Sequence, residues 1–447
     1  MAKKYLIETF GCQMNFHDSE RMAGLLEQAG YESAVDESDA DVIVINTCSV
    51  RERAEEKLFT RLGEINHQGK QSGERPIVAV AGCVAQQEGA NILRRSKAVD
   101  VMIGTQNLKR LPMLVDEAFH HRENCSAGGP ALDLHPMDDV SFPLGLAKRA
   151  DPLKAYVTII EGCNEFCAFC VVPYTRGKER MRPVAEIVGD AQRAADTGAV
   201  EIQLLGQIVN HYLAPDDPSC DFAALLERLH EIRGIDRIRF ASPHPRHVTP
   251  RMIEAMRTLP KVCRHLHLPV QSGSTEILRA MRRRHTREEY VELTVRLREA
   301  MPDLALSTDI IVGFPGETSD DFDATLSLTA AVRYHSMYSF RYSPRPNTLA
   351  LKRMPDDVSE EEKTRRLVEL QALQGRVQRE IYTSAIGQIE QVLIDSKSRR
   401  REWELSGRTS GNTVVNLSGD ASWIGRTIPV TITAANPNSL RGEASLG

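Results

Sequence analysis

Six cysteines of this 447-residue chain fall into two groups of three, and cysteine thiolates are the usual protein ligands of iron-sulfur clusters. The compact group is Cys163, Cys167 and Cys170. A four-iron cubane cluster normally takes four protein thiolates, so three would leave one iron open to a substrate or cofactor. Phe166 and Phe169 lie in the same loop and would shield such a cluster from water.

The second group is dispersed along the chain. Cys12, Cys48 and Cys83 each follow a short apolar run rich in β-branched residues. Such runs, alternating with helix-like stretches, predict a parallel sheet covered on both faces, which is the α/β class. Ligands of these sheets gather at the carboxyl ends of the strands, so we expect the three cysteines to meet there. A fourth run, 99–103, is followed by Gly104-Thr105 and has no cysteine.

A structural zinc site is the alternative interpretation of the compact group. Zinc sites usually combine a C-x2-C pair with a further Cys or His at regular spacing, and no second pair follows Cys170. We therefore favour the iron-sulfur cluster. The odd total of nine cysteines and the lack of an export signal argue against a disulfide framework. Cys125, Cys220 and Cys263 match no ligand position and are expected to be simple thiols.

The wider pattern predicts three domains. Residues 1–120 form the N-terminal parallel-sheet domain, 121–150 a linker rich in Gly, Pro, Asp and His, 151–381 a second α/β domain, and 382–447 a small antiparallel β-barrel. The second domain contains six successive β-α units, which predict a partial (β/α)6 barrel with its functional groups just after the strands. Its expected strands are 156–160, 202–205, 238–240, 266–268, 306–312 and 337–342.

Composition excludes several functional classes. No segment approaches the roughly 18 consecutive apolar residues of a membrane helix, and the N-terminus lacks a signal peptide, so we expect a cytoplasmic protein with no membrane partner. The net charge of -5 gives no overall sign of nucleic-acid binding, so RNA contact must come from local basic patches. The expected RNA-binding residues in the tail are Lys397, Arg399, Arg400 and Arg401. A second arginine-rich run, 279–287, is expected to be a solvated helix face.

Several segments carry a resemblance to a known family. In the first domain they are 9–15, 18–20, 46–51 and 81–86, and in the second 163–177, 271–274, 309–318 and 342–346. Together they resemble the radical S-adenosylmethionine (SAM) methylthiotransferases. The tail is similar to a TRAM domain, an RNA-binding β-barrel, through 407–409 and 414–416.

This resemblance implies two 4Fe-4S clusters, one on Cys163, Cys167 and Cys170 and one on the dispersed group. The open iron of the first would bind the amino and carboxylate groups of SAM. Reductive cleavage would then give methionine and a 5′-deoxyadenosyl radical, while the protein positions and shields the reacting groups. In the family scheme a first SAM methylates a sulfur at the second cluster, and the radical from a second SAM removes hydrogen from carbon 2 of an adenine.

Three residues near strand ends are expected to contact SAM or substrate: Gln207, Gln271 and Asp309. One motif departs from the family. Where the family usually reads Leu-Gly-Gln-Asn-Val-Asn, this chain has Leu205-Gly206-Gln207-Ile208-Val209-Asn210, so Ile208 removes any contact that an Asn side chain makes there.

The implied reaction is methylthiolation of N6-dimethylallyladenosine at position 37, in the anticodon arm of tRNA. The implied partners are tRNA, an electron donor such as flavodoxin or ferredoxin, and a sulfur donor, with the protein acting as a monomer. One alternative keeps the chemistry but acts on threonylcarbamoyl-adenosine of tRNA or on an aspartate of a ribosomal protein. Another is a non-enzymatic iron-sulfur RNA-binding sensor, against which two open-iron sites argue, because a sensor needs no site for SAM.

Overall fold

A computed structural model describes residues 2–49, 52–72, 75–124, 129–135, 145, 147–398, 401 and 403–445. The chain forms two compact units. Unit 1 comprises residues 1–152, 156–164 and 171–182, and unit 2 comprises 153–155, 165–170 and 183–447. The chain therefore passes from one unit to the other within the loop that carries the compact cysteine group. No helix within the described ranges is both long enough and apolar enough to cross a membrane.

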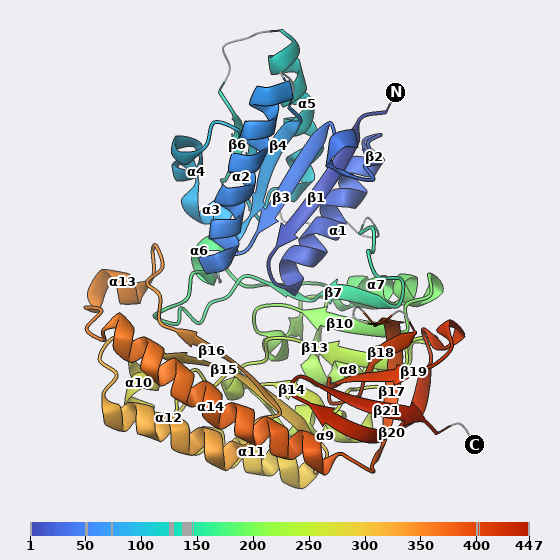
Figure 1. Cartoon of the computed structure of the whole chain (residues 1–447), viewed down its shortest axis with the longest axis vertical. Helices are drawn as coiled ribbons and strands as arrows, with labels where there is room; N and C mark the ends of the chain where they lie inside the picture. The colour runs from blue at the N-terminus through green and yellow to red at the C-terminus, as the bar shows by residue number, and fades with distance from the viewer. Residues whose placement is uncertain are drawn as a thin grey trace. The chain divides into compact units, whose positions relative to one another are not determined.

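Unit 1 is built on a parallel sheet with the strand order β2-β1-β3-β4-β5-β6 (Figure 1). Its strands are β1 (Lys4–Phe10), β2 (Glu32–Ser33), β3 (Val42–Thr47), β4 (Ile77–Gly82), β5 (Val101–Ile103) and β6 (Ala131–Asp133). The four apolar runs are confirmed as strands of a parallel sheet. The expectation of a linker over 121–150 is wrong at two places: a helix continues to Glu123, and β6 pairs with β5. A three-residue edge strand is too short to show a hydrophobic period.

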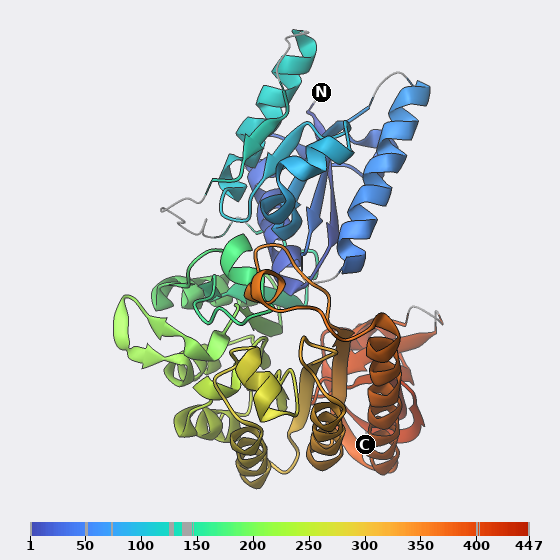
Figure 2. The ribbon, with the colours of Figure 1, turned by 90° about the vertical axis from the view of Figure 1, so that its left-hand side faces the viewer.

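Helices cover both faces of this sheet (Figure 2). Alternate side chains of a strand point to opposite faces, so Val42 and Val44 pack in the core beneath α1 and α5, whereas Ile43 and Ile45 pack beneath α2. The helices of unit 1 are α1 (Gln13–Gln28), α2 (Glu52–Ser72), α3 (Cys83–Glu88), α4 (Ala90–Arg95), α5 (Leu111–Glu123) and the short α6 (Val172–Thr175). The segment around α6 is framed by β8 (Ile160–Glu161) and β9 (Arg180–Met181), which pair antiparallel.

Unit 2 contains the β-α series. Its strands form two three-stranded sheets, β13-β10-β7 and β14-β15-β16, joined by a parallel bridge between Ile238 and Val262. The strands are β7 (Lys154–Thr158), whose first residues belong to this unit, β10 (Glu201–Leu205), β13 (Arg237–Phe240), β14 (His265–His267), β15 (Ala305–Val312) and β16 (Ser336–Arg341). The predicted partial (β/α)6 barrel is confirmed, with each predicted strand found within two residues of its expected bounds.

The helices of unit 2 are α7 (Val184–Asp196), α8 (Phe222–His230), α9 (Pro250–Thr258), α10 (Thr275–Ala280), α11 (Arg287–Ala300), α12 (Ser319–Val332), α13 (Leu349–Arg353) and α14 (Glu360–Ser384). Their starts follow the usual chemistry, because side-chain oxygens of Thr286 and Thr318 accept bonds from the first turns of α11 and α12. The long helix α14 packs along α12 and β16 (Figure 1). A two-stranded hairpin, β11 (Leu213–Ala214) and β12 (Asp217–Asp221), precedes α8.

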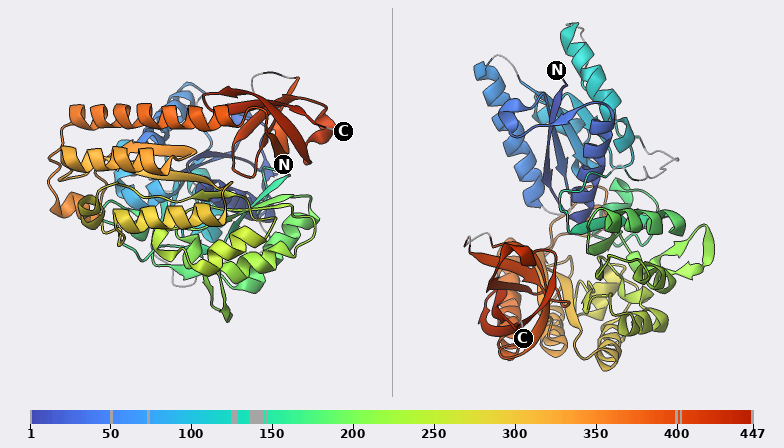
Figure 3. Two further views of the ribbon diagram at one scale, coloured as in Figure 1. Left: turned by 90° about the horizontal axis from the view of Figure 1, so that it is seen from below. Right: turned by 90° about the vertical axis from the view of Figure 1, so that its right-hand side faces the viewer.

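The C-terminal part of unit 2 is a closed five-stranded barrel, drawn in red in Figure 3. Its strands are β17 (Ile389–Lys397), β18 (Glu404–Arg408), β19 (Val414–Ser418), β20 (Thr427–Asn436) and β21 (Ser439–Ala444). Closure leaves no open sheet edge. The predicted small antiparallel barrel is confirmed, with one difference: β19 and β21 pair parallel.

The loop between β18 and β19 docks on the larger barrel of the same unit, at the amino ends of its strands. Arg239 on β13 is buried; its Nε donates to Glu201 at 2.9 Å, and its Nη1 and Nη2 donate to the carbonyls of Ser410 and Thr409 at 2.9 and 2.8 Å. Arg237 donates to the carbonyl of Arg408 at 2.6 Å. The small barrel is thus fastened to the larger one by buried, hydrogen-bonded arginines.

Candidate functional site

The dispersed cysteines lie at the carboxyl ends of neighbouring strands in unit 1. Cys12 caps the start of α1 after β1, Cys48 follows β3 directly, and Cys83 is the first residue of α3 after β4. A hydrogen bond with Cys48 lowers the pKa of the solvent-exposed Cys12 to about 6, with help from the charge of Arg176 and against desolvation by the protein atoms around it. Burial raises the pKa of Cys83, which also feels the charge of Cys12. The structure therefore brings the three thiols together.

Polar side chains beside these cysteines fix the strand ends. Asn15 Oδ1 accepts from the backbone amide and Sγ of Cys12 at 3.4 and 3.3 Å, and its Nδ2 donates to Asn46 Oδ1 at 3.1 Å. Asn46 in turn donates to the carbonyl of Asn15 at 2.8 Å. Gly82 has a φ of 90°, and a Cβ there would collide with Asn46 and the carbonyl of Thr47. The backbones can approach closely only because this position is glycine.

Two hydroxyl groups next to Cys48 are suited to a bound cluster. Thr47 Oγ1 and Ser49 Oγ are buried and have no hydrogen-bond partner among the described residues. A buried polar atom without a partner costs free energy, so a water molecule or a bound group is expected to complete its hydrogen bonding. Hydroxyl donors to the sulfurs of an iron-sulfur cluster are one of the means by which proteins adjust it. The donor set of three thiols and two hydroxyls therefore fits a cluster.

Arg176 also reaches this site, from the segment that follows the compact cysteine group. Its Nη2 lies 2.6 Å from Asp18 on α1, and it is 4% exposed. The backbone around it is held by the end of β5: Thr105 Oγ1 donates to the carbonyl of Thr175 at 2.6 Å, and Gln106 Nε2 donates to the carbonyl of Arg176 at 3.0 Å. The fourth apolar run, 99–103, has no cysteine, but the residues that follow it hold the backbone of Arg176 in place.

A second ion pair extends this buried charged network. Arg21 Nη1 lies 2.8 Å from Glu161 Oε1, and both side chains are buried. Burial works against the charged carboxylate, yet the positive charges of Arg21 and Arg176 hold the pKa of Glu161 below its usual value. The network therefore carries fixed charges at neutral pH.

The compact group lies where the chain passes between the units, with Cys163 in unit 1 and Cys167 and Cys170 in unit 2. The Cys163 amide donates to the carbonyl of Gly177 at 3.2 Å. In unit 2, the amide of Cys170 donates to the carbonyl of Cys167 at 3.0 Å, and Ala168 donates to the carbonyl of Met281 at 2.9 Å. These bonds fix the loop on each side of the passage.

No three His, Cys, Asp or Glu side chains are grouped for a single metal ion in the described part of the chain. A cubane cluster spreads its thiolate ligands over the corners of an iron-sulfur cube, so it needs them farther apart than one zinc ion does.

Of the two aromatic residues expected to shield the loop, Phe169 packs against the core around Ala168 and Met281, whereas Phe166 is 47% exposed.

Two of the three predicted SAM or substrate contacts, Gln207 and Gln271, lie beyond the carboxyl ends of barrel strands, and Asp309 lies within a strand. Gln207 follows β10, and its Oε1 is buried with no partner in the described structure. Gln271 follows β14 with a φ of 77°, and its amide donates to the carbonyl of Asp309 at 2.9 Å. Asp309, on β15, lies 3.4 Å from His267 Nε2. Ile208 is buried.

Two buried histidines at the same end of the barrel have defined tautomers. His244 Nδ1 accepts from the amide of Arg246 at 3.1 Å, so its proton is on Nε2. His285 Nδ1 lies 3.1 Å from the carbonyl of Arg283 and must donate to it, so its Nε2 is an acceptor. Burial keeps both rings neutral, lowering the pKa of His244 far below its usual value and that of His285 to about 4.

The Nε2 atoms of both histidines and Arg283 Nε are buried without a hydrogen-bond partner in the described ranges, whereas Glu165 Oε2 lies 3.6 Å from Arg284 Nε. The ring centroids of His244 and His285 are 5.8 Å apart, and Glu165 Oε1 accepts from His247 Nε2 at 3.3 Å. Donors and acceptors without partners thus line the barrel beside the cysteine loop. Such a set fits the amino and carboxylate groups of an amino-acid ligand such as SAM.

The arginine run 279–287 is only in part the solvated face that we expected, because Arg279, Arg282 and Arg284 are exposed and the other two arginines are not. Arg283 is buried, with Nη1 at 3.7 Å from Cys167 Sγ and Nη2 donating to the carbonyl of Pro269 at 2.7 Å. Arg287 donates to the carbonyls of Gly273 and Ala324 at 3.1 and 2.5 Å. The run is broken by Arg282 and Arg284, which have positive φ, so its side chains leave in different directions.

The basic residues of the tail are only partly described. Lys397 is exposed at the end of β17, and Arg401 is exposed and lies 3.1 Å from Glu404. Arg399 and Arg400 lie outside the described residues. Cys125 also lies outside them, whereas Cys220 and Cys263 are buried in unit 2, away from any ligand position.

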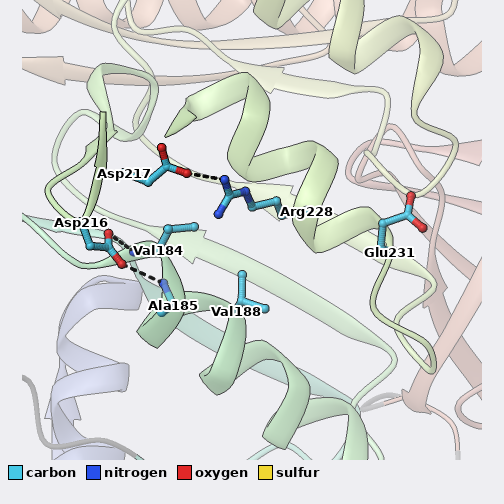
Figure 4. Close-up of a pocket in the computed structure, with 7 residues that line it drawn as sticks. All are labelled: Val184, Ala185, Val188, Asp216, Asp217, Arg228 and Glu231. Atoms are coloured by element: carbon cyan, nitrogen blue, oxygen red, sulfur yellow. Dashed lines mark hydrogen bonds and ion pairs between the residues drawn. The ribbon is translucent and has the colours of Figure 1, made fainter. Parts of the chain in front are cut away.

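A surface hollow of about 610 Å³ lies in unit 2 between the start of α7 and the β11–β12 hairpin (Figure 4). The Asp216 carboxylate already accepts from the amides of Val184 and Ala185 at the start of α7, at 2.8 and 3.3 Å. Arg228 is paired with Asp217. None of the predicted site residues lines this hollow, and its anion position is filled by the chain itself.

Sequence reasoning missed four residues that the structure places at these sites: Asn15, Asn46, Arg176 and Arg283. The two asparagines were visible as neighbours of cysteines. Arg176 and Arg283 carried no local signal, because their contacts are made with residues far away along the chain.

Comparison with known proteins gives three family matches. Residues 4–104 match the uncharacterized protein family UPF0004, residues 157–329 the radical SAM superfamily, and residues 384–445 the TRAM domain.

Curated relatives match over nearly the whole chain. A tRNA-2-methylthio-N(6)-dimethylallyladenosine synthase of Thiobacillus denitrificans is 46% identical over 445 residues, covering 99% of this chain and 98% of its own. The enzyme of the same name from Geotalea uraniireducens is 44% identical over 446 residues, covering 99% and 98%.

Solved structures share the fold. The radical SAM methyltransferase TsrM from Kitasatospora setae, solved with cobalamin and a [4Fe-4S] cluster, gives a TM-score of 0.58 at 15% identity, covering 78% of this chain and 77% of its own. The cobalamin-dependent SAM radical enzyme OxsB gives 0.53 at 12% identity, covering 83% and 56%.

Proposed function

Because this chain belongs to the family of tRNA-2-methylthio-N6-dimethylallyladenosine synthases, we propose that it attaches a methylthio group to carbon 2 of N6-dimethylallyladenosine at position 37 of tRNA. The observation that carries the proposal is the identity of 44 to 46% with these enzymes over nearly the full length of both chains. The radical SAM superfamily match indicates a 4Fe-4S cluster and SAM as cofactors.

Cys163, Cys167 and Cys170 are the proposed ligands of the SAM-binding cluster. When bound, the cluster and SAM supply a reductive cleavage that yields a 5′-deoxyadenosyl radical, which can remove hydrogen from an unactivated carbon. The chain's own residues bind and orient SAM. The acceptors Gln207 Oε1 and His285 Nε2 suit its amino group, and the donors of His244 and Arg283 suit its carboxylate.

Gln271 and Asp309 are the proposed contacts to the rest of SAM or to the substrate base. They lie on the same edge of the barrel as Gln207, and the backbone bond between them fixes their spacing. The apolar residues beneath them, among them the fully buried Val270 and Ile310, exclude water from this edge. Exclusion of water protects a reactive radical from side reactions.

Cys12, Cys48 and Cys83 are the proposed ligands of a second 4Fe-4S cluster, which would present the sulfur to be transferred. Support comes from three thiols at one sheet edge and from the hydroxyls of Thr47 and Ser49, which lack partners in the described structure. The exposure of Cys12 leaves a route for the substrate base to reach this edge.

The closed C-terminal barrel matches the TRAM domain, and tRNA is the substrate of the family. We propose that Lys397, Arg399, Arg400 and Arg401 contact phosphates of the anticodon arm, since salt-dependent phosphate contacts are the general basis of RNA affinity. An electron donor such as flavodoxin or ferredoxin and a sulfur donor complete the proposed partners. The protein would act as a monomer in the cytoplasm.

The substrate assignment is tested in a bacterial strain that lacks its own enzyme of this family. Expression of this chain should restore 2-methylthio-N6-dimethylallyladenosine in digested tRNA, measured by mass spectrometry of nucleosides. A methylthio group on threonylcarbamoyl-adenosine or on a ribosomal aspartate instead would contradict it. Absence of every such product despite bound clusters would favour an iron-sulfur sensor.

The division between the two cysteine groups is tested with purified protein. The reconstituted chain should hold about eight irons, and either triple Cys→Ala variant about four. With Cys12, Cys48 and Cys83 replaced, 5′-deoxyadenosine should still form while methylthio product disappears. Cys220→Ala and Cys263→Ala are matched controls, buried cysteines whose loss should leave the iron content unchanged.

A further inference from the structure

The guanidinium of Arg176 is one of the few permanent cations buried beside cysteines in the described structure, and neither the family resemblance nor the proposed reaction gives it a role. It follows α6, which packs against α3, the helix that begins at Cys83. Its carboxylate partner Asp18 lies on α1, the helix that begins after Cys12. Arg176 therefore sits between the two helices whose first turns carry two of the three thiols.

The surroundings hold Arg176 firmly in this place. Gln106 binds its carbonyl and Thr105 binds the carbonyl before it, at 3.0 and 2.6 Å. Asp18 is 1% exposed, so both partners of the ion pair are out of contact with solvent. Burying a charged pair costs free energy unless further interactions offset it. Contacts of this kind, made by a guanidinium whose charge also acts on the thiols of Cys12 and Cys83, indicate a function beyond packing.

The charge balance of the site supplies that function. Arg176 and Arg21 are balanced by Asp18 and Glu161 when the thiols are neutral. Three thiolates bound to an Fe4S4 core with a 2+ charge would add one net negative charge, and reduction would add another. The potential of an iron-sulfur cluster depends on net charge and on hydrogen bonds to its sulfurs. A donor cation beside the cysteines therefore makes reduction easier.

We propose that Arg176 is a positioning residue of the dispersed cysteine site, where its guanidinium donates to sulfur of the cluster bound by Cys12, Cys48 and Cys83 and raises the cluster's reduction potential. The inference rests on the proposed second cluster. It assigns to the segment after the compact cysteine group a direct influence on the other cluster.

The test isolates the second cluster in the full chain. With Cys163, Cys167 and Cys170 replaced by Ala, only the dispersed site can hold iron, and its potential is measured by anaerobic redox titration followed by electron paramagnetic resonance. Arg176→Gln should shift the reduction equilibrium at least tenfold toward the oxidised cluster, which is about 59 mV for one electron. Asp18→Asn, which removes the balancing carboxylate, should shift it in the opposite direction.

Two further variants separate this role from a structural one. Arg176→Lys keeps the charge and should restore most of the shift. Arg61→Gln is the matched control, because Arg61 is an arginine of the same unit whose partners are Glu8, Glu37 and Glu64 and include no cysteine. Its potential should equal that of the parent protein.

The outcomes are distinguishable. Absence of iron from the parent triple variant contradicts the second cluster itself, and the inference falls with it. A cluster that is present but has the same potential in Arg176→Gln and Asp18→Asn, or shifts in the same direction in both, overturns the role of Arg176 alone. If Arg176→Gln fails to fold, the opposite shift of Asp18→Asn and the retained potential of Arg176→Lys decide the question.

Discussion

At the amino ends of the barrel strands in unit 2, each guanidinium nitrogen of Arg239 has an acceptor, supplied by Glu201 and the β18–β19 loop. At the carboxyl ends, buried atoms of Gln207, His244 and His285 have none among the described residues. A buried polar atom without a partner destabilises the folded protein by roughly 1–3 kcal/mol. Atoms of this kind lie at the carboxyl ends of the strands, whereas each nitrogen of the Arg239 guanidinium at the amino ends is hydrogen-bonded. The first end stabilises the fold, and the second keeps the donors and acceptors that we propose for ligand binding.

The largest expected effect on stability comes from removing the Arg239 guanidinium at the amino ends of the barrel strands. Arg239→Gln leaves Glu201 as a buried carboxylate without its cation, so the free energy of unfolding should fall by about 3–5 kcal/mol. Urea unfolding of the full chain measures it. Arg257→Gln, which removes an exposed ion pair with Glu254 on α9, should leave the unfolding midpoint unchanged. Equal effects of the two variants would remove the distinction between the two ends.

The next effect is a loss of folding stability at acidic pH that comes from His285. The pKa of His285 is lowered to about 4 by burial and by the charge of Arg283, whereas an unfolded histidine titrates near 6.5. As the pH falls from 6.5 toward 4, His285 takes up a proton in the unfolded chain but stays neutral in the folded chain. The free energy of unfolding therefore falls over this pH range. The loss between pH 7 and pH 5 should be about 2 kcal/mol from this group.

His285→Asn keeps a donor for the Arg283 carbonyl but cannot titrate, so its stability should depend less on pH by that amount. Urea unfolding at pH 7 and pH 5 gives the comparison. His67→Asn, at an exposed position of α2, is the control and should leave the dependence as it is. An unaltered dependence in His285→Asn would mean that the ring takes up its proton over the same pH range in the folded and the unfolded chain.

A smaller effect is expected on SAM affinity when the His244 donor at the carboxyl ends of the strands is removed. His244→Asn preserves an acceptor for the Arg246 amide and deletes only the Nε2 donor. A hydrogen bond to a charged group such as the SAM carboxylate contributes at least about 1.5 kcal/mol, so SAM affinity measured by calorimetry should fall at least roughly tenfold while the unfolding midpoint stays constant. Lower stability with unchanged SAM affinity would assign His244 to packing.

The smallest effect lies on the C-terminal barrel, away from the loop that docks on β13. Replacing Lys397 and Arg401 with Ala should flatten the salt dependence of tRNA binding by about 0.7 per lost contact on single-stranded RNA. Arg401 already pairs with Glu404, so Lys397 should contribute more. Filter binding over a series of salt concentrations measures the slopes, and Arg426→Ala, elsewhere on the same barrel, is the comparison. Identical slopes in all three variants would mean that the run is solvated.

Strand positions were predictable because periodicity is a local property. The β-branched runs ending at Cys12, Cys48 and Cys83 specify a parallel sheet, and its geometry then brings their ends together. Short edges such as β6 escape this reasoning, because three residues cannot establish a period. The contacts of Arg239 could not be predicted for another reason, because an arginine within a strand gives no sign of an acceptor in a distant loop.

The same limit explains the two arginine runs. The run 279–287 and the run 397–401 look alike as sequences, but the first contains two left-handed residues, Arg282 and Arg284, that turn its side chains apart. Backbone reversals of this kind arise from tertiary packing. Arg283 consequently reaches Cys167, a contact that charge patterning could not indicate.

The docked β18–β19 loop also has a consequence for synthesis of the chain. Its acceptors for Arg237 and Arg239 are made late, after the whole (β/α)6 series has left the ribosome. Until then the Nη1 and Nη2 atoms of Arg239 and the Nη1 atom of Arg237 lack these acceptors, and the nascent barrel stays open at that end. Domains usually fold in order during translation. Here a chain that stops before Thr409 would carry an unfinished barrel, so early termination should yield a product recognised and degraded as misfolded.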